Sequence, residues 1–205
     1  AKGRIKLTKI SEGEKGLDNI IRDPHIHRPG PALAGYTALF TFDRVQILGN
    51  TEMRYLKTLS AEHRTKALKK FFSFNMPCIC LTFNNKPSDE FMEMANKKNI
   101  AVFITPLETT KFAYFINDFL DDQFSPQIAL HGSFVDVYGV GLLFYGRSGI
   151  GKSEIALDLI ERGHRLVADD VVMISRKGDG ILMGTGTELV KHFMEIRGLG
   201  IIDVR

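Results

Sequence analysis

A glycine-rich segment in the second half of the chain has the residue types needed to hold phosphate groups. It consists of Gly146, Arg147, Ser148, Gly149, Ile150, Gly151, Lys152 and Ser153. In the pattern G-x-x-x-x-G-K-[ST], glycines let successive backbone N–H groups turn towards phosphate oxygens, and the following helix directs its positive dipole end at them. Lys152 would reach the β and γ phosphates, and the Ser153 hydroxyl would bind Mg²⁺.

The surroundings of this segment decide between a phosphate site and a glycine-rich turn without a ligand. The bare pattern occurs by chance in roughly one chain of this length in a hundred. Here an apolar run at residues 141–145 precedes the loop, and residues 152–162 carry apolar side chains at helical spacing. A strand, a loop and a helix in this order are what phosphate binding requires, so the context favours a phosphate site.

Two neighbouring acids, Asp169 and Asp170, follow the apolar run at residues 166–168. A carboxylate at the end of a strand beside such a loop can hold Mg²⁺ or accept a proton. Neighbouring side chains of a regular strand point to opposite faces, so only one of the two should face the phosphates unless the strand bends. The pattern does not choose between them, and a solvated surface pair is the alternative.

A histidine and a glutamate complete the set of candidate residues. His131 lies in a β-rich run, and alternation places Ser133 on the same face of that strand. A strand histidine taken alone is more often structural than catalytic. Glu195 is followed by Gly198 and Gly200, which would let backbone approach a ligand. The alternative for Glu195 is a surface helix end with Gly198 as its cap.

Composition is typical of a globular protein and excludes several classes. The chain has 205 residues, of which 44% are hydrophobic and 25% charged. Its 27 Lys and Arg are scattered among 24 acids, so we expect no nucleic-acid partner. No apolar run reaches the roughly 20 residues of a membrane helix, and the polar start lacks a signal-peptide core, so we expect a cytoplasmic protein. Cys78 and Cys80 should be buried free thiols on one strand face.

The first part of the chain alternates strand and helix patterns. Short apolar runs at residues 45–48, 78–83 and 101–104 predict strands. Helices are predicted at residues 61–72 after the cap Ser60, at residues 89–98 after the cap Ser88, and at residues 106–122. This alternation predicts a small α/β layer with parallel strand pairing. The polar stretch at residues 121–126, which ends in a proline, divides the chain into domains at residues 1–124 and 125–205.

The second part begins with a different pattern. Residues 127–137 and 140–145 are β-rich runs separated by Tyr138 and Gly139, which predicts a hairpin leading into the glycine-rich loop. A helix at residues 152–162, ending before Gly163, and a strand at residues 165–174 should follow.

Taken together, these stretches resemble the HPr kinase/phosphorylase family, bifunctional bacterial enzymes that phosphorylate a serine of the phosphocarrier HPr. The resemblance rests on residues 131–132, 135–141, 146–154, 162–170 and 195–204, of which the last string resembles the signature of the family. In the first domain it rests on residues 26–30, 34–36 and 43–49. Nearly the whole chain is covered.

The resemblance implies a fold and an assembly. The fold class would be α/β, with a small α/β N-terminal domain followed by a P-loop kinase domain related to phosphoenolpyruvate carboxykinase. Members assemble as homohexamers. The family continues beyond the signature that ends near Arg205, so we expect a natural protein that is longer at both ends, with the C-terminal part of the kinase domain absent from this chain.

The resemblance also implies roles for the candidate residues. Residues 146–153 would bind ATP or pyrophosphate, and Ser153 and Glu195 would hold Mg²⁺. Asp170 would be the catalytic base towards the serine hydroxyl of HPr and, in the reverse reaction, the acid towards the leaving serine oxygen as phosphate attacks phosphoserine to give pyrophosphate.

The remaining roles follow in the same way. His131 and Lys152 would stabilise the phosphoryl groups, and Asp169 would assist near the metal or brace the loop. Through this reaction the family controls carbon metabolism. Two alternatives remain: a P-loop kinase acting on a small molecule, and a nucleotide-sensing regulator without catalysis.

Overall fold

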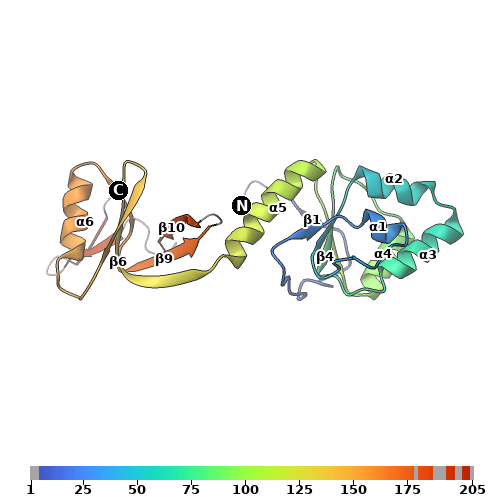
Figure 1. Ribbon diagram of the computed structural model, residues 1–205, viewed down its shortest axis with the longest axis horizontal. Coiled ribbons are helices and arrows are strands. Elements are labelled where there is room, and N and C mark those ends of the chain that lie inside the picture. The colour runs from blue at the N-terminus through green and yellow to red at the C-terminus, as the bar shows by residue number, and fades with distance from the viewer. Residues whose placement is uncertain (1–4, 178–179, 187–192, 197–199, 204–205) are drawn as a thin grey trace. The chain divides into compact units, whose positions relative to one another are not determined.

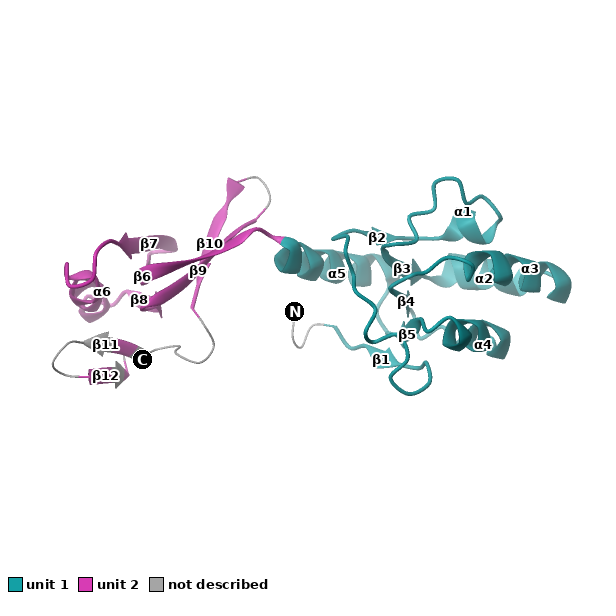
Figure 2. Cartoon of the chain, turned by 90° about the horizontal axis from the view of Figure 1, so that it is seen from below, with its two compact units in different colours: residues 1–124 teal, residues 125–205 magenta. Residues whose placement is uncertain are grey.

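The computed structural model describes residues 5–177, 180–186, 193–196 and 200–203. The chain consists of two compact units, residues 1–124 and residues 125–205, each with its own strands and helices (Figure 2). Each unit is described by itself.

The first unit is a five-stranded sheet in the order β1-β5-β4-β3-β2, covered by helices on both faces. Its strands are β1 (Thr8–Lys9), β2 (Ile26–His27), β3 (Val45–Leu48), β4 (Cys78–Leu81) and β5 (Ala101–Ile104). Its helices are α1 (Gly30–Leu33), α2 (Asn50–Thr58), α3 (Ala61–Phe71), α4 (Asp89–Lys97) and α5 (Thr109–Phe124) (Figure 1). Strands β2 to β5 are parallel and β1 is antiparallel to β5, so the predicted parallel α/β layer is confirmed.

Alternation along the strands divides the core of the first unit into two layers. Ile79 and Leu81 of β4 pack into the cluster formed with α1 to α4, whereas Cys80 packs against Phe112 and other residues of α5. Cys78 and Cys80 are free thiols, as predicted, but only Cys80 is buried, whereas Cys78 is half-buried. The hydrogen bond of Cys80 with Cys78 and its burial raise the pKa of Cys80, which keeps this thiol protonated and unreactive.

Local capping explains where the predicted helices begin. The Ser60 hydroxyl accepts the backbone N–H of His63 at 3.3 Å at the start of α3, and Ser88 accepts that of Phe91 at the same distance at the start of α4. Both predicted caps are confirmed. Helix α5 begins at Thr109 rather than at residue 106.

Further features of the first unit differ from the sequence prediction. Strand β4 ends at Leu81 instead of residue 83, because Phe83 and Asn84 have φ values of 57° and 52° in the left-handed region, which a strand does not allow. Helix α2 was not predicted. Its start is stabilised by Glu52, whose carboxylate accepts the backbone N–H of Gly49 at 2.8 Å and pairs with Arg28.

The second unit is organised around one long strand, β6. Its elements are β6 (Gln127–Val137), β7 (Val140–Tyr145), α6 (Lys152–Glu161), β8 (Arg165–Ala168), β9 (Val171–Arg176), β10 (Leu182–Thr185), β11 (Phe193–Ile196) and β12 (Gly200–Asp203). The sheet order is β10-β9-β6-β7, with β8 also paired to β6, and β11 and β12 form a separate antiparallel pair. The predicted hairpin of β6 and β7 and the helix after the loop are confirmed.

The prediction of one strand over residues 165–174 was wrong. The chain forms β8 and β9, interrupted at Asp169 and Asp170, because Asp170 has a φ of 70°. Both strands pair antiparallel with β6, β8 with its C-terminal part and β9 with its N-terminal part. The interruption therefore lies beside the middle of β6.

Within the described residues, no helix is both long enough and apolar enough to cross a bilayer.

The half-buried His27 gives the first unit an expected pH dependence. Burial lowers the pKa of His27 below its ordinary 6.5, and Arg44 lowers it further. As the pH falls through about 6.5, the unfolded chain therefore binds a proton that the folded chain takes up only at lower pH, and stability is lost. We expect His27→Gln to reduce the fall in unfolding free energy between about pH 7.5 and about pH 5.5 in urea titrations. An equal fall in both proteins would contradict this.

Candidate functional site

The glycine-rich loop connects strand β7 to helix α6. Gly149 and Gly151 have φ values of 82° and 96°, and Gly151 is the residue immediately before the helix. Glycine occupies this left-handed region without steric cost, so the chain turns sharply into α6 at Lys152. The first-turn N–H groups of α6 and its dipole then favour an anion in front of the helix.

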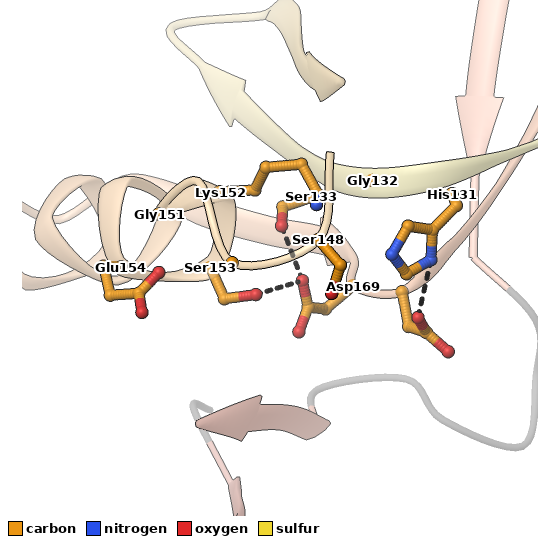
Figure 3. A pocket seen from close by; sticks show the side chains of 11 residues that line it. His131, Gly132, Ser133, Ser148, Gly151, Lys152, Ser153, Glu154 and Asp169 are labelled. Atoms are coloured by element: carbon orange, nitrogen blue, oxygen red, sulfur yellow. Dashed lines mark hydrogen bonds and ion pairs between the residues drawn. The ribbon is translucent and has the colours of Figure 1, made fainter. Parts of the chain in front are cut away.

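A pocket of about 190 Å³ lies in front of this helix start (Figure 3). It is lined by His131, Gly132, Ser133, Ser148, Gly149, Gly151, Lys152, Ser153, Glu154, Asp169 and Asp170. Of the eight predicted loop residues, five thus face the pocket. Gly146, Arg147 and Ile150 do not line it, and the Ile150 side chain is largely exposed.

Lys152 lies over the loop that precedes it. Its Nζ donates hydrogen bonds to the carbonyl oxygens of Gly146 at 3.2 Å and Arg147 at 3.0 Å. The ammonium group is therefore held at the loop, where it adds positive charge to the pocket wall. Gly146 and Arg147 contribute to the site through these carbonyls.

His131 and Asp170 both line the pocket and form a pair there. His131 Nδ1 and Asp170 Oδ1 are 2.8 Å apart, and the two side chains are 57% and 65% exposed. The backbone N–H of Gly132 donates to the Asp170 carbonyl at 3.1 Å, which fastens the interruption between β8 and β9 to strand β6. The pair is therefore open to solvent.

Asp169 occupies a different environment from its neighbour. Only 6% of it is exposed, and its Oδ1 accepts hydrogen bonds from Ser133 Oγ at 2.6 Å and Ser153 Oγ at 3.3 Å. The chain bends at Asp170, and both aspartates line the pocket. The sequence predicts this arrangement only for a strand that bends between them.

Ser133 and Glu154 line the pocket but were not among the predicted site residues. Alternation along β6 placed Ser133 on the face of His131, which was the signal available in the sequence. Nothing in the sequence indicated that this face would meet Asp169, because the contact joins residues 36 positions apart.

The predicted metal pair of Ser153 and Glu195 is only partly described. Ser153 lies in the pocket wall. Glu195 belongs to β11, and the side chain of Glu195 lies outside the described residues. Strand β11 packs near α6, since Met194 shares a buried cluster with Ala156. The role of Glu195 therefore stays a prediction.

The donor atoms of the pocket fit a hard divalent cation. The described part of the chain contains no group of three or more His, Cys, Asp or Glu residues arranged to hold a metal. Mg²⁺ needs no such group, because it is usually bound by one or two protein oxygens together with substrate phosphates and waters. Among the described residues, no basic side chain forms an ion pair with the buried carboxylate of Asp169. A buried charge is stabilised by a counter-charge, so Asp169 and Ser153 suit a cation.

The fold and the site define a class of α/β protein. A glycine-rich loop leads a strand into a helix, and a serine, two aspartates and a histidine face the helix start. This arrangement is typical of proteins that bind phosphate groups.

Comparison with known proteins defines the family. The family model "HPr Serine kinase N terminus" matches residues 2–120, and "HPr Serine kinase C-terminal domain" matches residues 122–205. The chain belongs to the HPr serine kinase family, as its sequence resemblance predicted.

Two curated relatives agree with this assignment. The HPr kinase/phosphorylase of Chloroherpeton thalassium is 58% identical over 200 residues, which cover 98% of this chain and 58% of the relative. That of Prosthecochloris aestuarii is 54% identical over 201 residues, which cover 98% of this chain and 59% of the relative. The chain therefore spans less than two thirds of the length of these relatives. A solved HPr(Ser) kinase/phosphatase from Coxiella burnetii is 39% identical, with 38% of this chain and 46% of that chain covered and a TM-score of 0.35.

Gly132 is expected to be essential for the shape of the pocket. A methyl group at this position would lie 2.4 Å from the carbonyl oxygen of Phe144 in the neighbouring strand β7, so the backbone would have to shift. We expect Gly132→Ala to lower the unfolding free energy by about 1–3 kcal/mol in chemical denaturation. Gly30→Ala is the control, because its methyl group would make an ordinary contact with Glu52 at 3.7 Å. Equal effects of the two substitutions would contradict the argument.

Proposed function

We propose that this chain carries the phosphoryl-transfer site of a kinase that phosphorylates a serine of HPr. The observation that carries the proposal is the pocket that joins the glycine-rich loop, the first turn of α6 and the pair of His131 and Asp170. Phosphoryl transfer consists mainly of positioning donor and acceptor and of stabilising charge. The names of the relatives support HPr as the protein that supplies the acceptor serine.

The loop side of the pocket suits the phosphates of ATP, with pyrophosphate as a second donor. The helix start and its N–H groups favour anionic oxygens. The ammonium group of Lys152 donates hydrogen bonds to two loop carbonyl oxygens, those of Gly146 and, at 3.0 Å, Arg147. When ATP binds, the ammonium group would donate to phosphate oxygens in place of these carbonyl oxygens. The N–H groups at the helix start and the Lys152 ammonium group would both stabilise the charge of the transferred phosphoryl group.

Asp170 is the proposed general base. Its Oδ1 is engaged by His131 Nδ1 at 2.8 Å, which orients the carboxylate. The carboxylate can then take the proton from a serine hydroxyl as that oxygen attacks the γ-phosphoryl group. With 65% of its side chain exposed, Asp170 can meet a serine that belongs to another protein. His131 would also contribute to binding the phosphoryl group.

Mg²⁺ would bind at Ser153 and Glu195, with Asp169 assisting. The Ser153 hydroxyl lies 3.3 Å from Asp169 Oδ1, which places an oxygen ligand beside a buried carboxylate. When bound, the cation would neutralise charge on the β and γ phosphates. Asp169 holds Ser153 in place through the same hydrogen bond.

The same carboxylate serves a reverse reaction. With inorganic phosphate attacking the phosphorus of phosphoserine, the bond from phosphorus to the serine oxygen breaks, and protonated Asp170 returns its proton to that oxygen. The products are serine and pyrophosphate.

The family resemblance supports three further proposals. We propose that the protein assembles as a homohexamer, lies in the cytoplasm and takes part in the control of carbon metabolism.

Substitution of the base tests the forward reaction. In the full-length natural protein with HPr, ATP and Mg²⁺, we expect phosphoserine on HPr by mass spectrometry, and Asp170→Asn should lower the rate by about a hundredfold or more while ATP still binds. Asp158→Asn is the matched control, since Asp158 lies on the surface of α6 in an ion pair with Arg162. If HPr stays unmodified although the protein binds ATP, the proposal is wrong and a nucleotide sensor is favoured. If the protein phosphorylates a metabolite but not HPr, a small-molecule kinase is favoured.

Addition of phosphate tests the reverse reaction. Purified phosphoserine-HPr incubated with the protein, Mg²⁺ and inorganic phosphate should yield pyrophosphate and unmodified HPr in equal amounts. Asp170→Asn should slow this reaction as strongly as it slows phosphorylation, because one carboxylate moves the proton in both directions. Release of inorganic phosphate without pyrophosphate would show hydrolysis instead of phosphorolysis.

A further inference from the structure

Ser133 provides a contact that the proposed reaction does not use directly. It lies in the middle of β6, opposite Phe144 of β7, and only 1% of it is exposed. Its hydroxyl donates a 2.6 Å hydrogen bond to Asp169 Oδ1, and Figure 3 shows this bond between the two pocket-lining side chains. Hydrogen bonds to a carboxylate from hydroxyl groups are short and strong at this distance.

The two serines that contact Asp169 are held differently. Ser133 is fixed by strand pairing in the interior of the sheet, whereas Ser153 is half-buried in the first turn of α6 and 3.3 Å from the same oxygen. The shorter bond and the more rigid donor belong to Ser133. If Ser153 turned towards a cation, Ser133 would keep Asp169 in its orientation.

Both hydrogen bonds end on Oδ1 of Asp169. Among the described residues, its second oxygen, Oδ2, has no hydrogen-bond or ion-pair partner. Asp169 lines the pocket together with Ser153. One oxygen thus serves to hold the side chain, and the other is available to the pocket.

We propose that Ser133 is a positioning residue, which fixes the buried Asp169 so that its second oxygen contributes to the Mg²⁺ site. This inference rests on the proposed function and adds to it a residue outside the glycine-rich loop. It also separates the two aspartates: Asp169 acts on the metal side and Asp170 on the proton side. Partners that orient a metal-binding group commonly change metal affinity 10–100-fold when they are lost.

Binding of Mn²⁺ tests this role without relying on catalysis. In the full-length natural protein with a non-hydrolysable ATP analogue, free Mn²⁺ is measured by electron paramagnetic resonance. We expect Ser133→Ala to weaken Mn²⁺ binding about tenfold or more, while the affinity for the analogue without metal changes less than about twofold. Ser133→Thr keeps the hydroxyl and should restore Mn²⁺ binding.

Matched variants distinguish positioning from general damage. Ser175→Ala removes a strand hydroxyl whose one hydrogen bond among the described residues is donated to the Met183 carbonyl, and it should leave Mn²⁺ binding unchanged. If Ser133→Ala does not fold, Ser133→Cys retains the volume with a weaker donor and should still weaken Mn²⁺ binding.

Mn²⁺ affinity within about twofold of the natural protein in a folded Ser133→Ala or Ser133→Cys variant would overturn the inference. Equal losses in the Thr and Ala variants would overturn it as well. Failure of the natural protein to phosphorylate HPr would instead reject the proposed function.

Discussion

The backbone conformation of Asp170 is the constraint on which the geometry of the site depends. A φ of 70° is uncommon for a residue other than glycine, although aspartate tolerates it better than most. The conformation interrupts the strand between β8 and β9, and the hydrogen bond from Gly132 to the Asp170 carbonyl fixes the interruption to β6. In a regular strand Asp169 and Asp170 would face opposite sides of the sheet. The interruption brings both side chains to one pocket.

The two aspartates then differ because their surroundings differ. Asp169 is buried and held by hydroxyl groups, so its charge is best stabilised by a cation close by. Asp170 is exposed and is contacted by His131 through one carboxylate oxygen, so it can be approached by a substrate group. Adjacent residues of the same type thereby suit a metal-binding role and a proton-transfer role.

Strand β6 and the glycine-rich loop position the remaining groups. β6 presents His131, Gly132 and Ser133 to the pocket, and its pairing with β7 aligns these residues with the strand that leads into the loop. The close approach of the Phe144 carbonyl leaves no space for a side chain at position 132. The loop glycines then turn the chain so that α6 begins at the pocket. The residues that line the described pocket thus come from one sheet, one helix and the segments that connect them.

The sequence by itself determined the local features of this protein. Alternating apolar residues, serine caps and the glycine pattern each act within a few residues, and they predicted β3, α3, the hairpin of β6 and β7, and the loop before α6. The resemblance of whole strings to one family was likewise readable without a structure. The conformation of Asp170 and the contact of Ser133 with Asp169 were decided only by the tertiary structure. Both depend on strand pairing between residues distant in the chain, which local patterns do not specify.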